Sequence, residues 1–337
     1  MEMSRPAYPH LVFWEITERC NLACGHCRRF MEEKDPMETQ RLFDILNQLK
    51  HWKGTRLVFT GGEPTLRSDL AELSERAVAQ GLIPLLATNG VGLSMELASR
   101  LYQSGIRKAS VSLLGHDEVS HDSRTNCAGS FRSAQEGIRR LQEAGIPVQI
   151  NFVVTRSTTH LLSHLIQLAM DMHAIALHLF LFVPVGRGCD MPGETLPRPQ
   201  DLLEIFPEIL RETKDAPIQT RFTCCPQYLV FLRSQGIDPA PHTAGCGAGK
   251  SVLFISARGK VYPCGYFPLE AGDLFQSNAP EIWEQSRILL DLADSLPRLK
   301  DCGECAHKRI CGGCRARAFA NSGDPFGPDP LCPYAPR

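Results

Sequence analysis

Short apolar runs alternate along the first half of the chain with segments of helical spacing. Segments such as 38–52, 70–81 and 130–145 repeat apolar residues at the three- and four-residue interval of an amphipathic helix. Several of the apolar runs are almost continuous in Val, Ile and Leu, which is typical of parallel strands buried on both faces. The series predicts right-handed β–α crossovers and a parallel α/β sheet, either doubly wound or curled toward a barrel. The expected strands are residues 11–17, 56–60, 82–88, 108–114, 148–154 and 177–183.

This alternation stops after Pro184. Residues 185–245 are rich in Pro and Gly, contain one expected helix at 201–213, and are interpreted as a bridge. Residues 246–337 show a hairpin pattern that turns at Arg258–Gly259, a helix near 279–293, and cysteine-rich loops. The apolar periodicity of this last segment is too weak for a core of its own, so a metal is expected to hold it together. The predicted units are residues 1–184, 185–245 and 246–337.

Composition narrows the classes of partner. The chain has 337 residues, 36 Lys and Arg against 37 Asp and Glu, and a net charge of −1, which gives no general attraction to nucleic acid or anionic membrane. The first 16 residues have a short apolar run that ends in an acid, without the features of a signal peptide. No stretch reaches the roughly 18–20 apolar residues of a membrane span. We therefore expect a soluble, cytoplasmic protein with no nucleic-acid or membrane partner.

Fourteen cysteines are unusual for such a chain, since disulfide frameworks belong to small secreted domains and clustered cytosolic cysteines more often bind metal. Three of them, Cys20, Cys24 and Cys27, have the spacing C-x₃-C-x₂-C directly after the first predicted strand. Thiolates at this spacing can hold three irons of a cubane cluster and leave the fourth iron open. A zinc site closed by His26, or three unrelated thiols, are the alternatives.

A second motif, F-T-G-G-E-P, ends the next predicted strand and contains Gly61, Gly62 and Glu63. Together with the cysteine spacing it resembles the radical S-adenosylmethionine (SAM) superfamily. The resemblance implies a partial (β/α)6 TIM-like barrel and a 4Fe-4S cluster whose open iron is chelated by SAM. It also implies that an electron from this cluster cleaves SAM to a 5′-deoxyadenosyl radical.

The resemblance also implies contacts to SAM. The two glycines would bring backbone polar groups against the methionine ammonium, as the absence of a side chain permits. Ser112 and Arg124 would contact the ribose and the carboxylate, and His26 would lie beside the adenine. Taken singly, Ser112 is an ordinary strand-end residue and Arg124 a surface charge. The expected SAM-binding residues are His26, Gly61, Gly62, Glu63, Ser112 and Arg124.

Seven further cysteines near the carboxyl end resemble the SPASM (or twitch) extension, which carries auxiliary iron–sulfur clusters in radical SAM enzymes. A zinc ribbon is the alternative for C-x₂-C pairs. By the family pattern, one auxiliary 4Fe-4S cluster would be held by Cys302, Cys305, Cys311 and Cys332. A second site would use Cys246, Cys264 and Cys314, with a fourth ligand missing and a shorter spacing than usual before Cys314. We therefore expect at least one auxiliary cluster.

Longer phrases resemble the radical SAM enzymes of alternative haem biosynthesis. They are LHLFLFVPVGRG (177–188), TCCPQY (223–228), residues 249–273, CGGCRARAFANSGD (311–324) and LCPY (331–334). Within that group the resemblance is to haem b synthase, and Cys-Arg-Arg at 27–29 supports it because the related siroheme-derivative enzymes tend to carry Tyr there. The resemblance implies oxidative decarboxylation of two propionates of Fe-coproporphyrin III to vinyl groups. An auxiliary cluster would accept the excess electron, and a flavodoxin or ferredoxin would supply the reducing electron.

Substrate contacts are expected from cations, because the iron porphyrin carries four carboxylates. The candidates are Arg187, Arg315 and Arg317, with Tyr228 facing the macrocycle and His116 as a guess for an iron ligand. Each arginine could equally be a surface residue, and the neighbouring pair Cys224–Cys225 could be buried apolar thiols. Three other functions stay open: a deacetylase of a siroheme-derived iron porphyrin, a peptide-modifying SPASM maturase, and a redox or haem-binding carrier.

Overall fold

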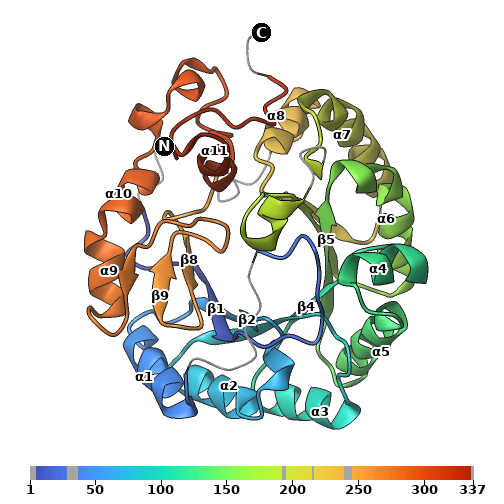
Figure 1. Ribbon diagram of the computed structural model, residues 1–337, viewed down its shortest axis with the longest axis vertical. Coiled ribbons are helices and arrows are strands. Elements are labelled where there is room, and N and C mark those ends of the chain that lie inside the picture. The colour runs from blue at the N-terminus through green and yellow to red at the C-terminus, as the bar shows by residue number, and fades with distance from the viewer. Residues whose placement is uncertain (1–4, 29–36, 192–194, 215, 239–244, 335–337) are drawn as a thin grey trace.

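A single curved sheet of ten strands organises the computed structural model, which describes residues 5–28, 37–191, 195–214, 216–238 and 245–334 (Figure 1). The strand order is β10-β9-β8-β1-β2-β3-β4-β5-β6-β7, with β8 and β1 to β7 all parallel and β9 and β10 antiparallel additions. This is the predicted TIM-like α/β architecture. The strands are β1 (Leu11–Thr17), β2 (Arg56–Gly61), β3 (Ile83–Thr88), β4 (Ala109–Ser112), β5 (Val148–Val154), β6 (Ala176–Leu181), β7 (Gln219–Thr223), β8 (Val252–Ile255), β9 (Lys260–Tyr262) and β10 (Gly272–Asp273).

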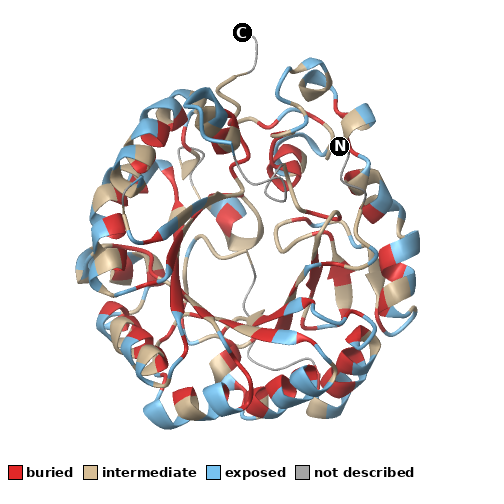
Figure 2. Cartoon of the chain, turned by 180° about the vertical axis from the view of Figure 1, so that it is seen from behind, coloured by how far each residue is buried: buried red, intermediate tan, exposed pale blue. Residues whose placement is uncertain are grey.

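Helices surround the strands as an outer ring, with buried residues turned toward the sheet and exposed residues toward solvent (Figures 1 and 2). Local signals place several of their ends, since Ser94 caps α3 and Asp117 forms a capping box at α4. The helices are α1 (Thr39–Leu49), α2 (Leu70–Ala79), α3 (Met95–Gln103), α4 (Glu118–Thr125), α5 (Ser130–Glu143), α6 (Leu162–Asp171), α7 (Pro199–Thr213), α8 (Gln227–Ser234), α9 (Ala279–Gln285), α10 (Arg287–Ala293) and α11 (Arg315–Ser322). In the described part of the chain no helix is long and apolar enough to cross a membrane.

Successive side chains along each strand face either the helices or the concave side of the sheet. Val12, Trp14 and Ile16 of β1, like Leu57 and Phe59 of β2, are buried in the core between the sheet and the helices. The residues between them face the concave side of the sheet, because successive strand side chains point to opposite faces. The concave side is therefore free to hold polar and functional groups while the helix-facing side supplies the apolar packing.

The six predicted strands are all present, with ends shifted by at most two residues. Residues 185–245 contain more regular structure than the predicted single helix, since β7 pairs in parallel with β6 and α8 follows it. The sequence Q-T-R-F-T has too few apolar residues to indicate a strand. The predicted hairpin is confirmed as β8 and β9, and β8 extends the sheet by pairing with β1. The helix expected near 279–293 is two helices, divided at Ser286, whose backbone is extended.

Candidate cluster and cofactor site

The three cysteines of the first motif lie on the loop after β1 and line one cavity of about 230 Å³. Residues at the carboxyl ends of β2 to β6 form the remaining walls, because parallel strands all end on the same side of a barrel. The loop is tied to the barrel by the amide of Ala23, which donates to the carbonyl of Thr125 at 3.1 Å. A site for the first cluster is therefore placed where a TIM-type barrel carries its chemistry.

Burial, together with the neighbouring Cys27 and Cys20, raises the pKa of Cys24 to about 12, against a lowering effect of Arg187. The free thiol therefore stays protonated at neutral pH, and binding iron must release its proton. Among the described residues no three His, Cys, Asp or Glu side chains are arranged to hold a single metal ion. A cubane needs no such convergence, because each thiolate binds a different iron.

The two glycines of the second motif pack against the cysteine loop. A Cβ on Gly61 would lie 2.4 Å from the carbonyl oxygen of Thr17, and one on Gly62 would lie 2.1 Å from that of Arg19. The amide of Gly62 donates to the Thr17 carbonyl at 3.0 Å, and that of Glu63 donates to the Arg19 carbonyl at 2.8 Å. Only glycine permits this approach, so the motif fixes the position of the cysteine loop and also lines the cavity.

Glu63 is fully buried and points into the protein, outside the set of residues that line the cavity. One carboxylate oxygen accepts from the hydroxyl of Thr88 at 2.6 Å and from Thr65, while the other accepts from the amide of Asn89 at 2.7 Å. Burial raises the pKa of Glu63, although these hydrogen-bond donors act to lower it. Because Thr88 and Asn89 do line the cavity, Glu63 positions the wall of the site at the end of β3.

Of the other expected SAM contacts, Ser112 and His26 line the cavity, whereas Arg124 is not among its lining residues. Burial, with Arg124 and Arg187 nearby, lowers the pKa of His26 to about 4, so this imidazole is neutral. Arg124 donates to the carbonyl of Ser120 within α4 at 2.6 Å. Arg187 also lines the cavity, and its buried Nε has no hydrogen-bond partner in the described structure. An unpaired guanidinium N–H at this position suits an anionic ligand.

Arg28 and Tyr266 are among the cavity residues that were not predicted. Arg28 forms a 2.7 Å ion pair with Glu15 and lies over the ring of Phe254 at 4.5 Å. Tyr266, from the loop after Cys264, lines the same cavity. The Cys-Arg-Arg tripeptide was a partial signal for Arg28, although Arg29 lies outside the described residues. Nothing local in the sequence indicated that residues beyond 246 would reach the first cluster site.

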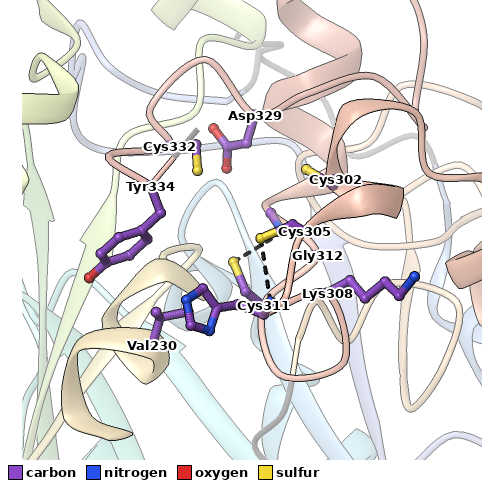
Figure 3. Close-up of a pocket in the computed structure, with 11 residues that line it drawn as sticks. Val230, Cys302, Cys305, Lys308, Cys311, Gly312, Asp329, Cys332 and Tyr334 are labelled. Atoms are coloured by element: carbon purple, nitrogen blue, oxygen red, sulfur yellow. Dashed lines mark hydrogen bonds between the residues drawn. The ribbon is translucent and has the colours of Figure 1, made fainter. Parts of the chain in front are cut away.

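The four cysteines of the expected first auxiliary set lie around one cavity. Cys302, Cys305, Cys311 and Cys332 line one cavity together with Tyr334 and Asp329 (Figure 3). The amide of His307 donates to the sulfur of Cys305, and that of Gly313 donates to the sulfur of Cys311, both at 3.4 Å. Four thiols with N–H···S donors fit a fully ligated 4Fe-4S cluster, whose potential such donors help to set.

A further cysteine, Cys224, lies beside the expected second set. The thiols of Cys224 and Cys314 are hydrogen-bonded to each other, and Cys314 lies close enough to Cys246 and Cys264 to raise their pKa values. The hydrogen bond from Cys224, helped by Arg317, lowers the pKa of Cys314 to about 6. Cys224 adopts a left-handed backbone (φ 57°) directly after β7. Its neighbour Cys225 is buried in the apolar core. Burial among apolar residues was the alternative expectation for this pair of cysteines.

Arg317 and Asp329 form a fully buried ion pair at 2.7 Å beside both cysteine sets. Asp329 accepts from the amide of Cys314 at 2.8 Å and lines the first auxiliary cavity, while Arg317 donates to the carbonyl of Cys224 at 3.0 Å. Arg315 is also buried and donates to the carbonyls of Pro325 and Gly327. The donors of Arg317 all face protein atoms, which argues against its expected substrate role, and Arg315, whose Nη2 has no hydrogen-bond partner among the described residues, lies outside the lining of the first cavity.

Tyr228 and His116 also lie away from the cavity lining. Tyr228 stacks on Phe231 and packs against Phe206, and burial raises its pKa to about 12. His116 contacts His164, with ring centroids 4.9 Å apart, and approaches Asp117 at 3.6 Å. The expectation of a macrocycle contact for Tyr228 does not fit this position.

Two family models match the chain. The radical SAM superfamily matches residues 14–164, and the SPASM iron–sulfur cluster-binding domain matches residues 246–315. The chain belongs to the radical SAM superfamily and carries a SPASM domain. It is a radical SAM enzyme, whose cofactors are SAM and 4Fe-4S clusters, auxiliary clusters included.

Similarity to curated proteins extends over nearly the whole chain. AdoMet-dependent heme synthases of Nitratidesulfovibrio vulgaris (strain Hildenborough) and Methanosarcina barkeri (strain Fusaro) are 34% and 35% identical, covering 97% of this chain and 93% and 97% of those proteins. Mycofactocin maturase MftC of Mycolicibacterium smegmatis is 30% identical over 96% of this chain and 82% of its own length.

Solved structures share the fold at low identity. SuiB of Streptococcus suis bound to S-adenosylmethionine has a TM-score of 0.76 at 17% identity, covering 97% of this chain and 77% of that chain. The protein anSMEcpe with bound AdoMet has a TM-score of 0.75 at 17% identity, covering 96% and 94%. Both comparisons support the barrel and its carboxyl-terminal extension as one architecture.

Proposed function

We propose that this enzyme is a haem synthase that converts two propionates of Fe-coproporphyrin III into vinyl groups and so forms protohaem. The observation that carries the proposal is the 34–35% identity to AdoMet-dependent heme synthases over 97% of the chain. The wider similarity extends to the maturase MftC, so the substrate class rests on the heme synthase relatives and on the unpaired Nε of Arg187 in the cavity.

The reaction needs a hydrogen-atom acceptor and an electron acceptor. Each propionate, –CH₂CH₂COO⁻, becomes –CH=CH₂ by losing CO₂, one hydrogen atom and one electron. Bound SAM and the clusters would supply the radical chemistry and take up the electron. Cys20, Cys24 and Cys27 would hold the first cluster, with a flavodoxin or ferredoxin as the proposed electron donor.

The chain's own residues orient the reactants. Gly61, Gly62, Ser112 and His26 line the part of the cavity proposed for SAM, and Glu63 keeps its wall in place. A neutral His26 suits contact with an aromatic base, because no desolvated charge is placed against it. Arg187, with an unpaired buried Nε, is proposed to hold a substrate carboxylate in the same cavity.

The two auxiliary cysteine sets are proposed to receive the electron. We assign the second set as a complete four-cysteine site of Cys224, Cys246, Cys264 and Cys314, which raises the expected content to two auxiliary clusters. Its loop also contributes Tyr266 to the wall of the first cavity. This auxiliary site is therefore adjacent to the place where the substrate radical would form.

The proposal is tested by anaerobic incubation of the reconstituted protein with SAM, dithionite and Fe-coproporphyrin III, followed by mass spectrometry. We expect the porphyrin to lose CO₂ and one hydrogen atom in each of two successive steps, with two 5′-deoxyadenosines formed per haem. Deoxyadenosine formation without a change in the porphyrin would reject this substrate. A siroheme-derived iron porphyrin and then precursor peptides would be assayed next, the peptides because of the similarity to MftC.

A further inference from the structure

The concave side of the barrel carries cations below the cavity described above. Thr60 of β2, Ser112 of β4 and Phe180 of β6 line that cavity. Because alternate strand residues share a face, Arg56, Lys108 and His178 lie on the same side, nearer the amino-terminal ends of the strands. Lys108 comes directly before β4, and the hydrogen bonds between β3 and β4 continue to it, because its carbonyl accepts from the amide of Leu86 at 3.1 Å. From Ser112 to Lys108 the strand descends about 13 Å.

Arg221 of β7 joins this group through strand register. A continuous row of paired residues runs from Ser112 through Asn151 and His178 to Arg221. The neighbour of Arg221, Phe222, points the other way and packs against Phe206 of α7. Arg221 therefore faces the concave side. We call Arg56, Lys108 and Arg221 the lumen cations.

Two groups on this face, Lys108 and His178, have lowered pKa values because they are buried beside cations. Burial lowers the pKa of Lys108 most, and the positive charges of Arg221 and Arg56 lower it further. Burial, followed by Arg221 and Lys108, lowers the pKa of His178 to about 3, so that its imidazole is neutral. In the described part of the chain, no ion pair or side-chain hydrogen bond engages any of the lumen cations.

This lining is unusual for the architecture. TIM-type barrels fill their interior with branched apolar side chains, whereas here the cations are accompanied by Ser110, Gln149 and Asn151 on the same face. Grouped like charges that no carboxylate of the described residues neutralises by an ion pair cost folding free energy through mutual repulsion. Arg56 and Arg221 are exposed, so a solute can reach them. A group of this kind is suited to an anion that arrives with the substrate.

We propose that the lumen cations bind carboxylates of the substrate that do not react. This inference rests on the proposed function, in which the substrate carries four propionates and the product keeps two. Carboxylates held at the amino-terminal end of the barrel would turn the reacting edge of the molecule toward SAM. Arg187, which lines the cavity, would act at the upper end. The lumen cations, which lie below that lining, would act at the lower end.

The test is a spectrophotometric titration of cluster-loaded, oxygen-free protein with Fe-coproporphyrin III in the absence of SAM. The double variant Lys108→Gln/Arg221→Gln is compared with wild type and with Arg107→Gln. Arg107 is a matched control, since it adjoins Lys108 but is exposed on the outer side, where it donates to the carbonyl of Tyr102. We expect the Kd of the double variant to rise at least about tenfold, or about 1.4 kcal/mol, with Arg107→Gln within about twofold of wild type.

Protohaem, which keeps the two carboxylates that do not react, serves as a second ligand, and its Kd is expected to rise in the double variant by a factor similar to that of Fe-coproporphyrin III. Equal binding of Fe-coproporphyrin III by wild type and the double variant would overturn the lumen inference and leave the proposed function standing. Failure of the wild type to bind Fe-coproporphyrin III would overturn the proposed function. The single variants Lys108→Gln and Arg221→Gln are titrated separately in case the double variant does not fold.

Discussion

Replacing Cys224 with alanine tests whether the second auxiliary site has four cysteine ligands. The thiol of Cys224 is hydrogen-bonded to that of Cys314, beside Cys246 and Cys264. Three 4Fe-4S clusters correspond to about twelve irons per chain, so loss of one leaves about eight. We expect Cys224→Ala to lower the iron content of the reconstituted protein toward eight.

Cys225→Ala is the matched control, because it removes the neighbouring thiol from the apolar core. It is expected to cost on the order of 1 kcal/mol of stability through lost packing and to retain all the iron. Iron analysis is combined with EPR of the dithionite-reduced protein, since three remaining thiolates could keep a cluster with one open iron and an altered spectrum. Unchanged iron and an unchanged spectrum in Cys224→Ala would refute the four-cysteine assignment. Equal changes in both variants would refute it as well.

Three other variants test the remaining parts of the site. Cys24→Ala should abolish formation of 5′-deoxyadenosine while the auxiliary EPR signals persist, and retained SAM cleavage would contradict the assignment of the first cluster. Gly62→Ala should displace the cysteine loop and lower SAM cleavage at least about tenfold, whereas Gly25→Ala, with nothing within 4 Å of its new Cβ, should behave like wild type. Asp329→Asn leaves the buried charge of Arg317 unpaired and should lower the free energy of unfolding by about 3–5 kcal/mol at pH 7 in denaturant titrations. Burial opposes ionisation of Asp329, but Arg317 and the N–H donors outweigh this effect and lower its pKa in the folded protein below 3.8. The stability difference between wild type and Asp329→Asn should therefore vanish as the pH falls through this lowered pKa. A difference that persists in acid would contradict the ion-pair explanation.

Much of the architecture was readable from local pattern. The runs at 11–17 and 148–154 coincide with β1 and β5, because a buried parallel strand needs consecutive apolar residues. The cysteine spacing and the Gly-Gly-Glu-Pro loop are likewise local, since each lies within one strand-end loop. Such features could be predicted because neighbouring residues alone impose them.

The strand β7 and the helix α8 were missed for the opposite reason. The sequence of β7 is polar on one side because Arg221 faces the lumen, so its apolar signal is reduced to Phe222. Only pairing with β6 identifies it as a strand. A strand that carries functional residues on its concave face loses the pattern by which strands are found.

The sequence by itself determined the superfamily and the barrel and indicated the three cysteines proposed for the first site, because short motifs encode these features within single loops. Tertiary structure alone brought Cys224 to Cys314 and buried Arg317 against Asp329. It also gathered cations from separate strands on one face of the sheet. Spacing along the chain constrains only groups a few residues apart, whereas the direction in which a distant side chain points depends on strand register and packing.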